Sequence, residues 1–263
     1  MSERAIARAF GAARSAGRAA LIPYYTAGYP TRAACLDALR GAAAAGADVV
    51  EVGIPFSDPL ADGPTIQRST QTALEQGMTV AGVLQLVRDA GLAIPVVLMT
   101  YVNPVLAYGV ERFATDARAA GVAGALFTDL PAGAAPELEG AVAAHLDLIR
   151  LVAPTTTDER LAAAVSGAGG FIYLISRLGV TGARPDAPAD LERHVRRLRG
   201  VTQLPIAVGF GISTPAQAAA AARWADGVVV GSALVDALGG GGLAAARSLL
   251  ESLAGALATR GAA

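Results

Sequence analysis

Short apolar runs alternate with longer alanine-rich stretches along most of the chain. The short runs are rich in β-branched residues, while the longer stretches repeat their apolar positions at helical spacing. The pattern predicts eight strands, at Ala20–Tyr25, Asp48–Gly53, Pro95–Thr100, Gly124–Phe127, Leu146–Val152, Gly170–Ile175, Pro205–Val208 and Gly227–Val230. It also predicts helices between them that begin near Thr31, Thr65, Val110, Ala135, Thr157, Pro188, Thr214 and Ser232.

Eight strands, each followed by a helix, favour a closed (β/α)8 (TIM) barrel over an open sheet. The length of 263 residues suits one such barrel, and no linker or composition break divides it, so we expect a single domain over residues 1–263. An extra N-terminal helix is predicted before the first strand, because Ile6, Phe10 and Ala13 recur at helical spacing. The same Arg-rich segment mildly resembles a transit peptide, but little chain precedes the first strand. The Gly239–Gly242 run predicts a loop or an interruption of the last helix.

The composition narrows the class of partners. Hydrophobic residues make up 53% of the chain, charged residues 16%, and the net charge is −1, which gives no basic surface for nucleic acid. No segment approaches the roughly 20 uncharged apolar residues of a membrane span. Cys35 is the only cysteine, so a disulfide framework is excluded and a reducing compartment, the cytoplasm, is expected.

The basic residues limit the possible chemistry further. All 21 are arginine, so a Schiff base on a lysine is excluded. The only histidines, His145 and His194, lie far apart in polar helical contexts, which leaves almost no basis for a zinc site, and no metal is expected. Any reaction must therefore use carboxylates, hydroxyls and backbone groups.

Glu51 is the strongest candidate for such chemistry, because it lies near the end of an otherwise apolar predicted strand. Strand alternation puts it on the same face as Val49, so it faces the barrel interior if Val49 does. A carboxylate without water has a raised pKa, which suits a general acid or base. The alternative is a structural ion pair, but the flanking strand and loop contain no arginine.

The loop that follows Glu51 carries two more carboxylates. Asp58 and Asp62 lie among Pro55, Pro59 and Pro64, whose fixed φ angles stiffen the chain. Each aspartate could cap a turn, as Asp often does beside Pro, or could meet a ligand above the barrel mouth. The local sequence leaves both interpretations open.

Two glycine-bearing turns follow the last two predicted strands. Gly209-Phe-Gly211 follows the seventh, and Gly231-Ser232 follows the eighth and opens a helix. Barrels often bind phosphate at these two loops, where free N–H groups and the helix dipole favour an anion. One such turn is weak evidence, since glycine also simply permits tight turns, but the pair favours a phosphate site.

Taken together, these residues resemble the tryptophan synthase α chain family. The run from Glu51 to Gln67 looks like that family's signature, with a glutamate and an aspartate eleven positions apart. Further similar segments span the chain, at Tyr24–Pro30, Met99–Pro104, Asp129–Pro131, Ser176–Gly182, Gly209–Ile212 and Gly231-Ser232.

The resemblance implies cleavage of indole-3-glycerol phosphate to indole and glyceraldehyde 3-phosphate. It implies that Glu51 is the general acid/base and that Asp62 accepts the indole N–H. The other implied substrate-binding residues form the indole walls, flank the glycerol chain, hold Asp62 or line the phosphate: Tyr24, Leu98, Tyr173, Thr181, Gly182, Gly209, Phe210, Gly211, Gly231 and Ser232.

The resemblance also implies a partner. Loops 54–64 and 177–188 would close over the substrate and face a β subunit in an α2β2 assembly, to which indole passes. The implied interface residues are Pro55, Asp58, Asn103 and Pro131. Pyridoxal phosphate would belong to the β subunit, and this chain would hold no cofactor.

Two other functions remain open from the sequence. One is a stand-alone indole-3-glycerol-phosphate lyase that serves specialised metabolism. The other is a catalytically silent subunit that binds a phosphate ligand and regulates a partner, although the presence of both Glu51 and Asp62 argues against it.

Overall fold

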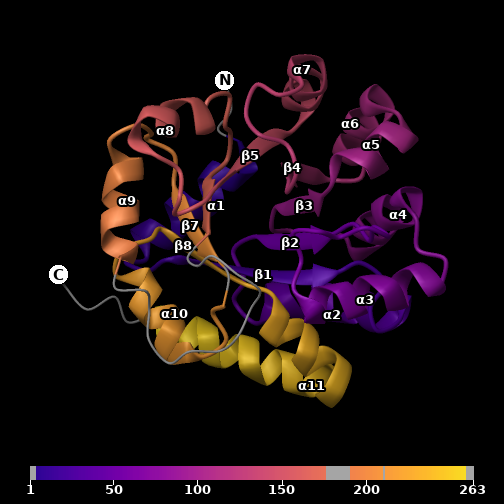
Figure 1. Ribbon diagram of the computed structural model, residues 1–263. Coiled ribbons are helices and arrows are strands. Elements are labelled where there is room, and N and C mark those ends of the chain that lie inside the picture. The colour runs from indigo at the N-terminus through magenta and orange to yellow at the C-terminus, as the bar shows by residue number, and fades with distance from the viewer. Residues whose placement is uncertain (1–3, 176–189, 210, 259–263) are drawn as a thin grey trace.

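Eight parallel strands close into a barrel in their sequence order (Figure 1). The computed structural model describes residues 4–175, 190–209 and 211–258. The strands are β1 Ala20–Thr26, β2 Val50–Gly53, β3 Val96–Thr100, β4 Val122–Phe127, β5 Asp147–Val152, β6 Ile172–Ile175, β7 Ile206–Gly209 and β8 Gly227–Val230. Every predicted strand is confirmed, with ends that differ by two residues at most, and so is the (β/α)8 barrel.

Helices surround the strands, and one more precedes them (Figure 1). They are α1 Ala5–Ser15, α2 Arg32–Ala44, α3 Pro64–Glu75, α4 Val80–Ala90, α5 Val102–Tyr108, α6 Val110–Ala119, α7 Pro136–His145, α8 Asp158–Ala164, α9 Leu191–Arg199, α10 Pro215–Ala222 and α11 Ser232–Leu257. The predicted starts hold to within one residue, except that Pro188 lies outside the described residues. The sequence pattern does not separate α4 from α3, nor α5 from α6.

Threonine caps fix several of these helix starts. The side chains of Thr31 and Thr79 accept hydrogen bonds from backbone N–H groups three residues on, at 3.2 and 3.1 Å. Thr214 forms a capping box with Gln217. Each capped helix begins shortly after a strand or a preceding helix, which keeps the βα loops short and the barrel compact.

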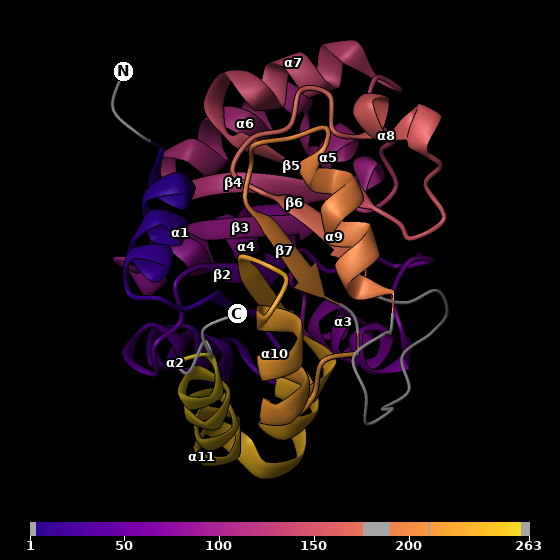
Figure 2. The same ribbon diagram turned by 90° about the vertical axis from the view of Figure 1, so that its left-hand side faces the viewer.

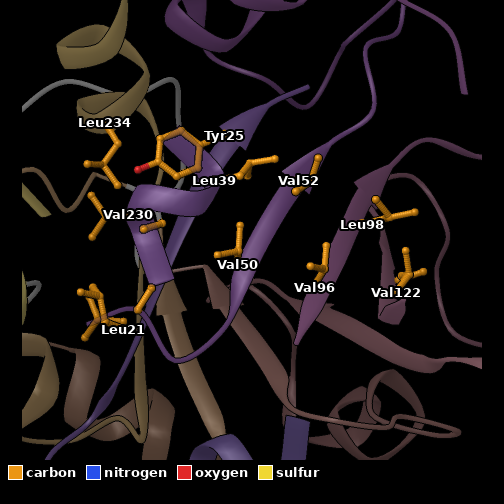
Figure 3. Packing of buried hydrophobic residues seen from close by; sticks show 14 of the residues in the cluster. Leu21, Tyr25, Leu39, Val50, Val52, Val96, Leu98, Val122, Val230 and Leu234 are labelled. Carbon is orange, nitrogen blue, oxygen red and sulfur yellow. The ribbon is translucent and has the colours of Figure 1, made fainter. Parts of the chain in front are cut away.

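The outer core lies between the strands and the helices. Alternate strand residues point outward into it, among them Val50, Val52, Val96 and Leu98 (Figure 3). Helix residues such as Leu39 and Leu234 pack against this layer. The remaining strand residues face the barrel interior, so the face on which a residue lies decides whether it can reach the mouth.

Helix α1 closes the end of the barrel at which the strands begin (Figure 2). Its Ile6 and Phe10 join the inner core, and the ring centroid of Phe10 lies 5.5 Å from that of Phe171. A Cβ atom at Gly227 would lie 2.8 Å from the Phe10 ring, so the ring fits there because residue 227 is glycine. The predicted N-terminal helix is confirmed as part of the barrel.

The last helix, α11, is interrupted as the glycine run predicts, with non-helical angles at Gly242 (φ 70°, ψ −166°). It is the one helix in the described part of the chain with the length and apolar composition of a membrane span, which is weak evidence by itself. Here α11 packs against β1, α2 and α10, so it belongs to the outer layer of the barrel.

Candidate active site

A cavity of about 220 Å³ lies at the carboxyl ends of the strands. Elements far apart in the sequence contribute to it, from β1 through to α11. Its described lining is Tyr24, Glu51, Asp62, Gly63, Thr65, Ile66, Met99, Tyr173, Gly211, Ile212, Ser213, Val229, Gly231, Ser232, Ala233 and Asp236. Glu51, Asp62 and the predicted anion-binding turn of α11 therefore share one cavity.

Glu51 faces the barrel interior on β2, where its backbone pairs with Tyr24 of β1. Only 1% of Glu51 is exposed, and its buried Oε1 has no hydrogen-bond partner within the described structure. Burial, and then the charge of Asp62, raise the pKa of Glu51 to about 8. The carboxyl group is therefore mostly protonated at neutral pH and can act as an acid.

Asp62 lies on the loop after β2 and lines the cavity. The Tyr101 hydroxyl donates a hydrogen bond to its Oδ2 at 3.1 Å, and the Ala61 N–H donates to the Tyr101 oxygen at 3.0 Å. Burial raises the pKa of Asp62 to about 6, against the lowering effect of the Tyr101 hydrogen bond. Asp62 is thus ionised at a pH where Glu51 is protonated, a separation typical of acid–base pairs.

Asp58, the other loop carboxylate, lies elsewhere. It is exposed, does not line the cavity, and accepts a hydrogen bond from Ser57 Oγ at 2.5 Å. Of the two interpretations that the sequence leaves open, a local turn contact fits Asp58 and a ligand contact fits Asp62.

Two tyrosine rings reach the cavity because glycines make room for them. A side chain at Gly53 would come within 2.0 Å of the Tyr24 hydroxyl, and one at Gly209 within 2.0 Å of the Tyr173 hydroxyl. Gly209 is absent from the described lining, so its predicted contact with the phosphate stays a prediction. Its missing side chain gives space to Tyr173 on the neighbouring strand.

The Tyr24 hydroxyl belongs to a buried chain of hydroxyl groups whose direction can be derived. Ser69 Oγ donates to the Ile66 carbonyl at 2.9 Å, because a carbonyl can only accept. Thr26 Oγ1 must then donate to Ser69 Oγ at 2.6 Å, and Tyr24 to Thr26 Oγ1 at 3.3 Å. The Tyr24 oxygen therefore keeps only acceptor capacity for any other neighbour.

The cavity lining also offers backbone donors, in a chain that has no lysine. Gly231 is the residue before α11, and Ser232 and Ala233 are its first residues. The first N–H groups of a helix lack partners within it and carry partial positive charge. Gly211, with φ +82°, turns the chain after β7 beside them. This arrangement suits the phosphate end of a ligand.

The prediction that Leu98 binds the substrate is wrong. Leu98 points away from the cavity into the outer core, beside Val96 and Val122 (Figure 3). The next residue, Met99, lines the cavity instead. Side chains alternate along a strand, so Leu98, which the resemblance implied, lies on the other face of β3 from Met99.

Three predicted site residues, Thr181, Gly182 and Phe210, lie outside the described residues. The predicted interface residues lie on loops and a helix start near the carboxyl ends of β2, β3 and β4. Asp58, Asn103 and Pro131 are exposed, whereas Pro55 is buried within the chain itself.

Several lining or supporting residues were not predicted for the site: Thr65, Met99, Tyr101, Ser213, Ala233 and Asp236. Tyr101 directly follows β3, and its position at a strand end is a signal that could have found it. Within the described residues, no group of three or more His, Cys, Asp or Glu side chains is placed to hold a metal ion.

The fold and the cavity define a (β/α)8 barrel with two carboxyl groups of separated pKa facing a helix N-terminus. The family model described as tryptophan synthase alpha chain matches residues 10–256. The chain belongs to the tryptophan synthase α chain family, whose members are lyases of tryptophan biosynthesis.

Individual proteins agree with this family. The tryptophan synthase alpha chain of Acidiphilium cryptum is 52% identical over 240 residues, which cover 90% of this chain and 87% of that protein. A solved structure of Mycobacterium tuberculosis tryptophan synthase is 44% identical with a TM-score of 0.91, covering 98% of this chain and 100% of that one. The alpha chain from Legionella pneumophila is 33% identical with a TM-score of 0.89, and each chain is fully covered. Nothing in these comparisons supports a stand-alone lyase or a silent regulatory subunit.

Proposed function

We propose that this chain cleaves indole-3-glycerol phosphate to indole and glyceraldehyde 3-phosphate, with Glu51 and Asp62 as its catalytic residues. One observation supports this above the others. A buried, protonated carboxyl group and an ionised one line a single cavity whose lining also includes a helix N-terminus. The ligand that such a cavity fits has an aromatic N–H at one end and a phosphate at the other.

In the proposed steps Glu51 first donates a proton and then accepts one, so it ends in its starting protonation state. Neutral Glu51 protonates the indole ring carbon that bears the glycerol chain, and Asp62 stabilises the positive charge that develops on the ring nitrogen. The resulting Glu51 carboxylate then takes the proton of the adjacent side-chain hydroxyl. The carbon–carbon bond breaks, its electron pair returns to the indole ring, the hydroxyl carbon becomes an aldehyde, and Glu51 is protonated again.

In this proposal the indole ring lies against Tyr24, Ile66 and Met99, and Tyr173 flanks the glycerol chain. The phosphate accepts hydrogen bonds from backbone groups at Gly211, Gly231 and Ser232. Thr181, Gly182, Gly209 and Phe210 remain predicted contacts.

We also propose a β subunit as the partner, in an α2β2 assembly that carries pyridoxal phosphate in the partner only. Exposed Asp58, Asn103 and Pro131 near one end of the barrel are the proposed contacts. The whole chain would act as one domain, in the cytoplasm, where its single buried cysteine stays reduced.

The direct test is to incubate the purified chain with indole-3-glycerol phosphate and to measure indole, with and without a cognate β subunit. We expect indole in both cases and faster release with the partner. No indole under either condition would overturn the proposal. An already fast chain that the partner leaves unchanged would favour a stand-alone lyase.

The pH dependence of cleavage should be bell-shaped. The reaction needs ionised Asp62, whose pKa is about 6, and protonated Glu51, whose pKa is about 8. Activity should therefore rise through pH 6, reach a maximum near pH 7 and fall through pH 8. Values of kcat/KM measured from pH 5 to 9 check this, and a flat profile across that range would contradict the roles assigned to Glu51 and Asp62.

Replacing Tyr101 with Phe should move the acidic limb of this profile to higher pH. The substitution removes the hydrogen bond that stabilises the Asp62 carboxylate, and loss of that bond raises the carboxyl pKa. The alkaline limb, set by Glu51, should stay in place. A variant with an unchanged acidic limb would show that Tyr101 does not act on Asp62.

A further inference from the structure

An acidic side chain lines the cavity beside the proposed phosphate-binding turn. Asp236 is four residues after Ser232, one turn further along the same face of α11. The Thr65 hydroxyl, on α3, donates a hydrogen bond to its Oδ2 at 3.0 Å. A carboxylate held there opposes the binding of an anion, although the helix N-terminus favours it.

Arg68 compensates this charge from the neighbouring helix. Its guanidinium lies 3.4 Å from Asp236 Oδ1 and 3.2 Å from Thr65 Oγ1, so the three side chains link α3 to α11. Asp236 and Thr65 both line the cavity, and Arg68, which does not line it, contacts both of these side chains. The Arg68 side chain is 67% exposed, so solvent surrounds most of it.

We propose that Arg68 and Asp236 are an opposed pair of specificity residues that set the affinity for the phosphate group. Asp236 weakens phosphate binding, and Arg68 offsets it by exchanging its contact with Asp236 for one with the phosphate. This inference rests on the proposed function, because it assumes a phosphate at the N-terminus of α11. It adds a side-chain cation to a site that otherwise uses backbone donors.

The size of the effect follows from simple electrostatics. Two unit charges about 7 Å apart in water change a binding constant about threefold, and a doubly charged phosphate squares that factor. Each single charge removal should therefore change affinity by about threefold to tenfold. Because both side chains are more than half exposed, salt should screen most of the effect.

The test compares Asp236→Asn, Arg68→Gln and the double variant. Titration calorimetry with glycerol 3-phosphate gives the Kd, and indole release gives KM and kcat. We expect Asp236→Asn to lower Kd and KM, Arg68→Gln to raise both, and the double variant to lie near the unmodified protein. The kcat should change by less than about twofold, and the differences should shrink in 0.5 M salt.

A matched control is the exposed ion pair between Arg32 of α2 and Asp89, the latter on α4, with an N–O distance of 2.5 Å. Neither residue lines the cavity, so Arg32→Gln and Asp89→Asn should leave Kd and KM unchanged. If both cavity variants weaken binding, or neither changes it, while the unmodified chain binds and cleaves, the charge-pair inference is overturned. If the unmodified chain neither binds glycerol 3-phosphate nor releases indole, the proposed function itself fails.

Discussion

Replacing Glu51 with Gln should lower the rate of indole release by about 1,000-fold or more, while the chain stays folded. General acid–base catalysis by a placed side chain contributes roughly 10²–10⁴-fold, and here one carboxyl group both gives and takes the proton. Glutamine keeps the size of the side chain but can do neither. The measurement is single-turnover indole release at pH 7, compared with binding of glycerol 3-phosphate, which should be unchanged.

Glu139 provides a matched control, because it is also a buried glutamate but belongs to an ion pair. Arg150 donates to its carboxylate, as do the N–H groups of Gly133 and Ala135. Glu139→Gln should therefore lower stability, since breaking a buried pair costs roughly 3–5 kcal/mol, without removing the chemistry. Full turnover by Glu51→Gln would exclude Glu51 from the mechanism.

The same Glu51 variant has a second expected signature, in stability. The pKa of Glu51 is about 8 in the folded chain against 4.5 as its ordinary value, so the folded state holds the proton more tightly. Its stability contribution is fully present below pH 4.5 and is lost as pH rises toward 8. Glutamine does not titrate. The Tm of Glu51→Gln relative to the unmodified protein should thus rise between pH 4.5 and 8 and level off above.

The sequence predicted the barrel because the fold depends on a repeated pattern. Each strand and helix carries its own period, so an error in one boundary does not change the architecture. Glu51 was predicted correctly to face the interior for the same reason, since Val49 lies in the inner core. Leu98, which the resemblance implied as part of the indole pocket, was wrong because it lies one position before Met99 and therefore faces the outer core.

Other features of the site depend on contacts between distant segments, which no local pattern encodes. Tyr101 reaches Asp62 across 39 positions, and Arg68 reaches Asp236 across 168. Gly209 also leaves space for the Tyr173 ring on the adjacent strand, a role that the glycine-bearing turn in the sequence does not indicate. Such roles follow from the register between strands, and the sequence alone does not give that register.

Replacing Phe10 with Ala should destabilise the chain by roughly 3–5 kcal/mol, the range for loss of a buried aromatic side chain. Only 2% of Phe10 is exposed, and its ring packs against Phe171 inside the end of the barrel that α1 closes. Gly227 leaves the space that the ring fills, and backbone around a closed barrel has little freedom to collapse into it. Urea unfolding followed by circular dichroism measures the loss.

Leu106→Ala is the control, since Leu106 is 53% exposed and its removal should change stability by about 0.5 kcal/mol or less. Phe10 lies at the opposite end of the barrel from the cavity, so the fraction of Phe10→Ala that remains folded should cleave substrate at the normal rate. A loss below about 1 kcal/mol would contradict the inference that the Phe10 ring, and with it α1, stabilises the core at this end of the barrel.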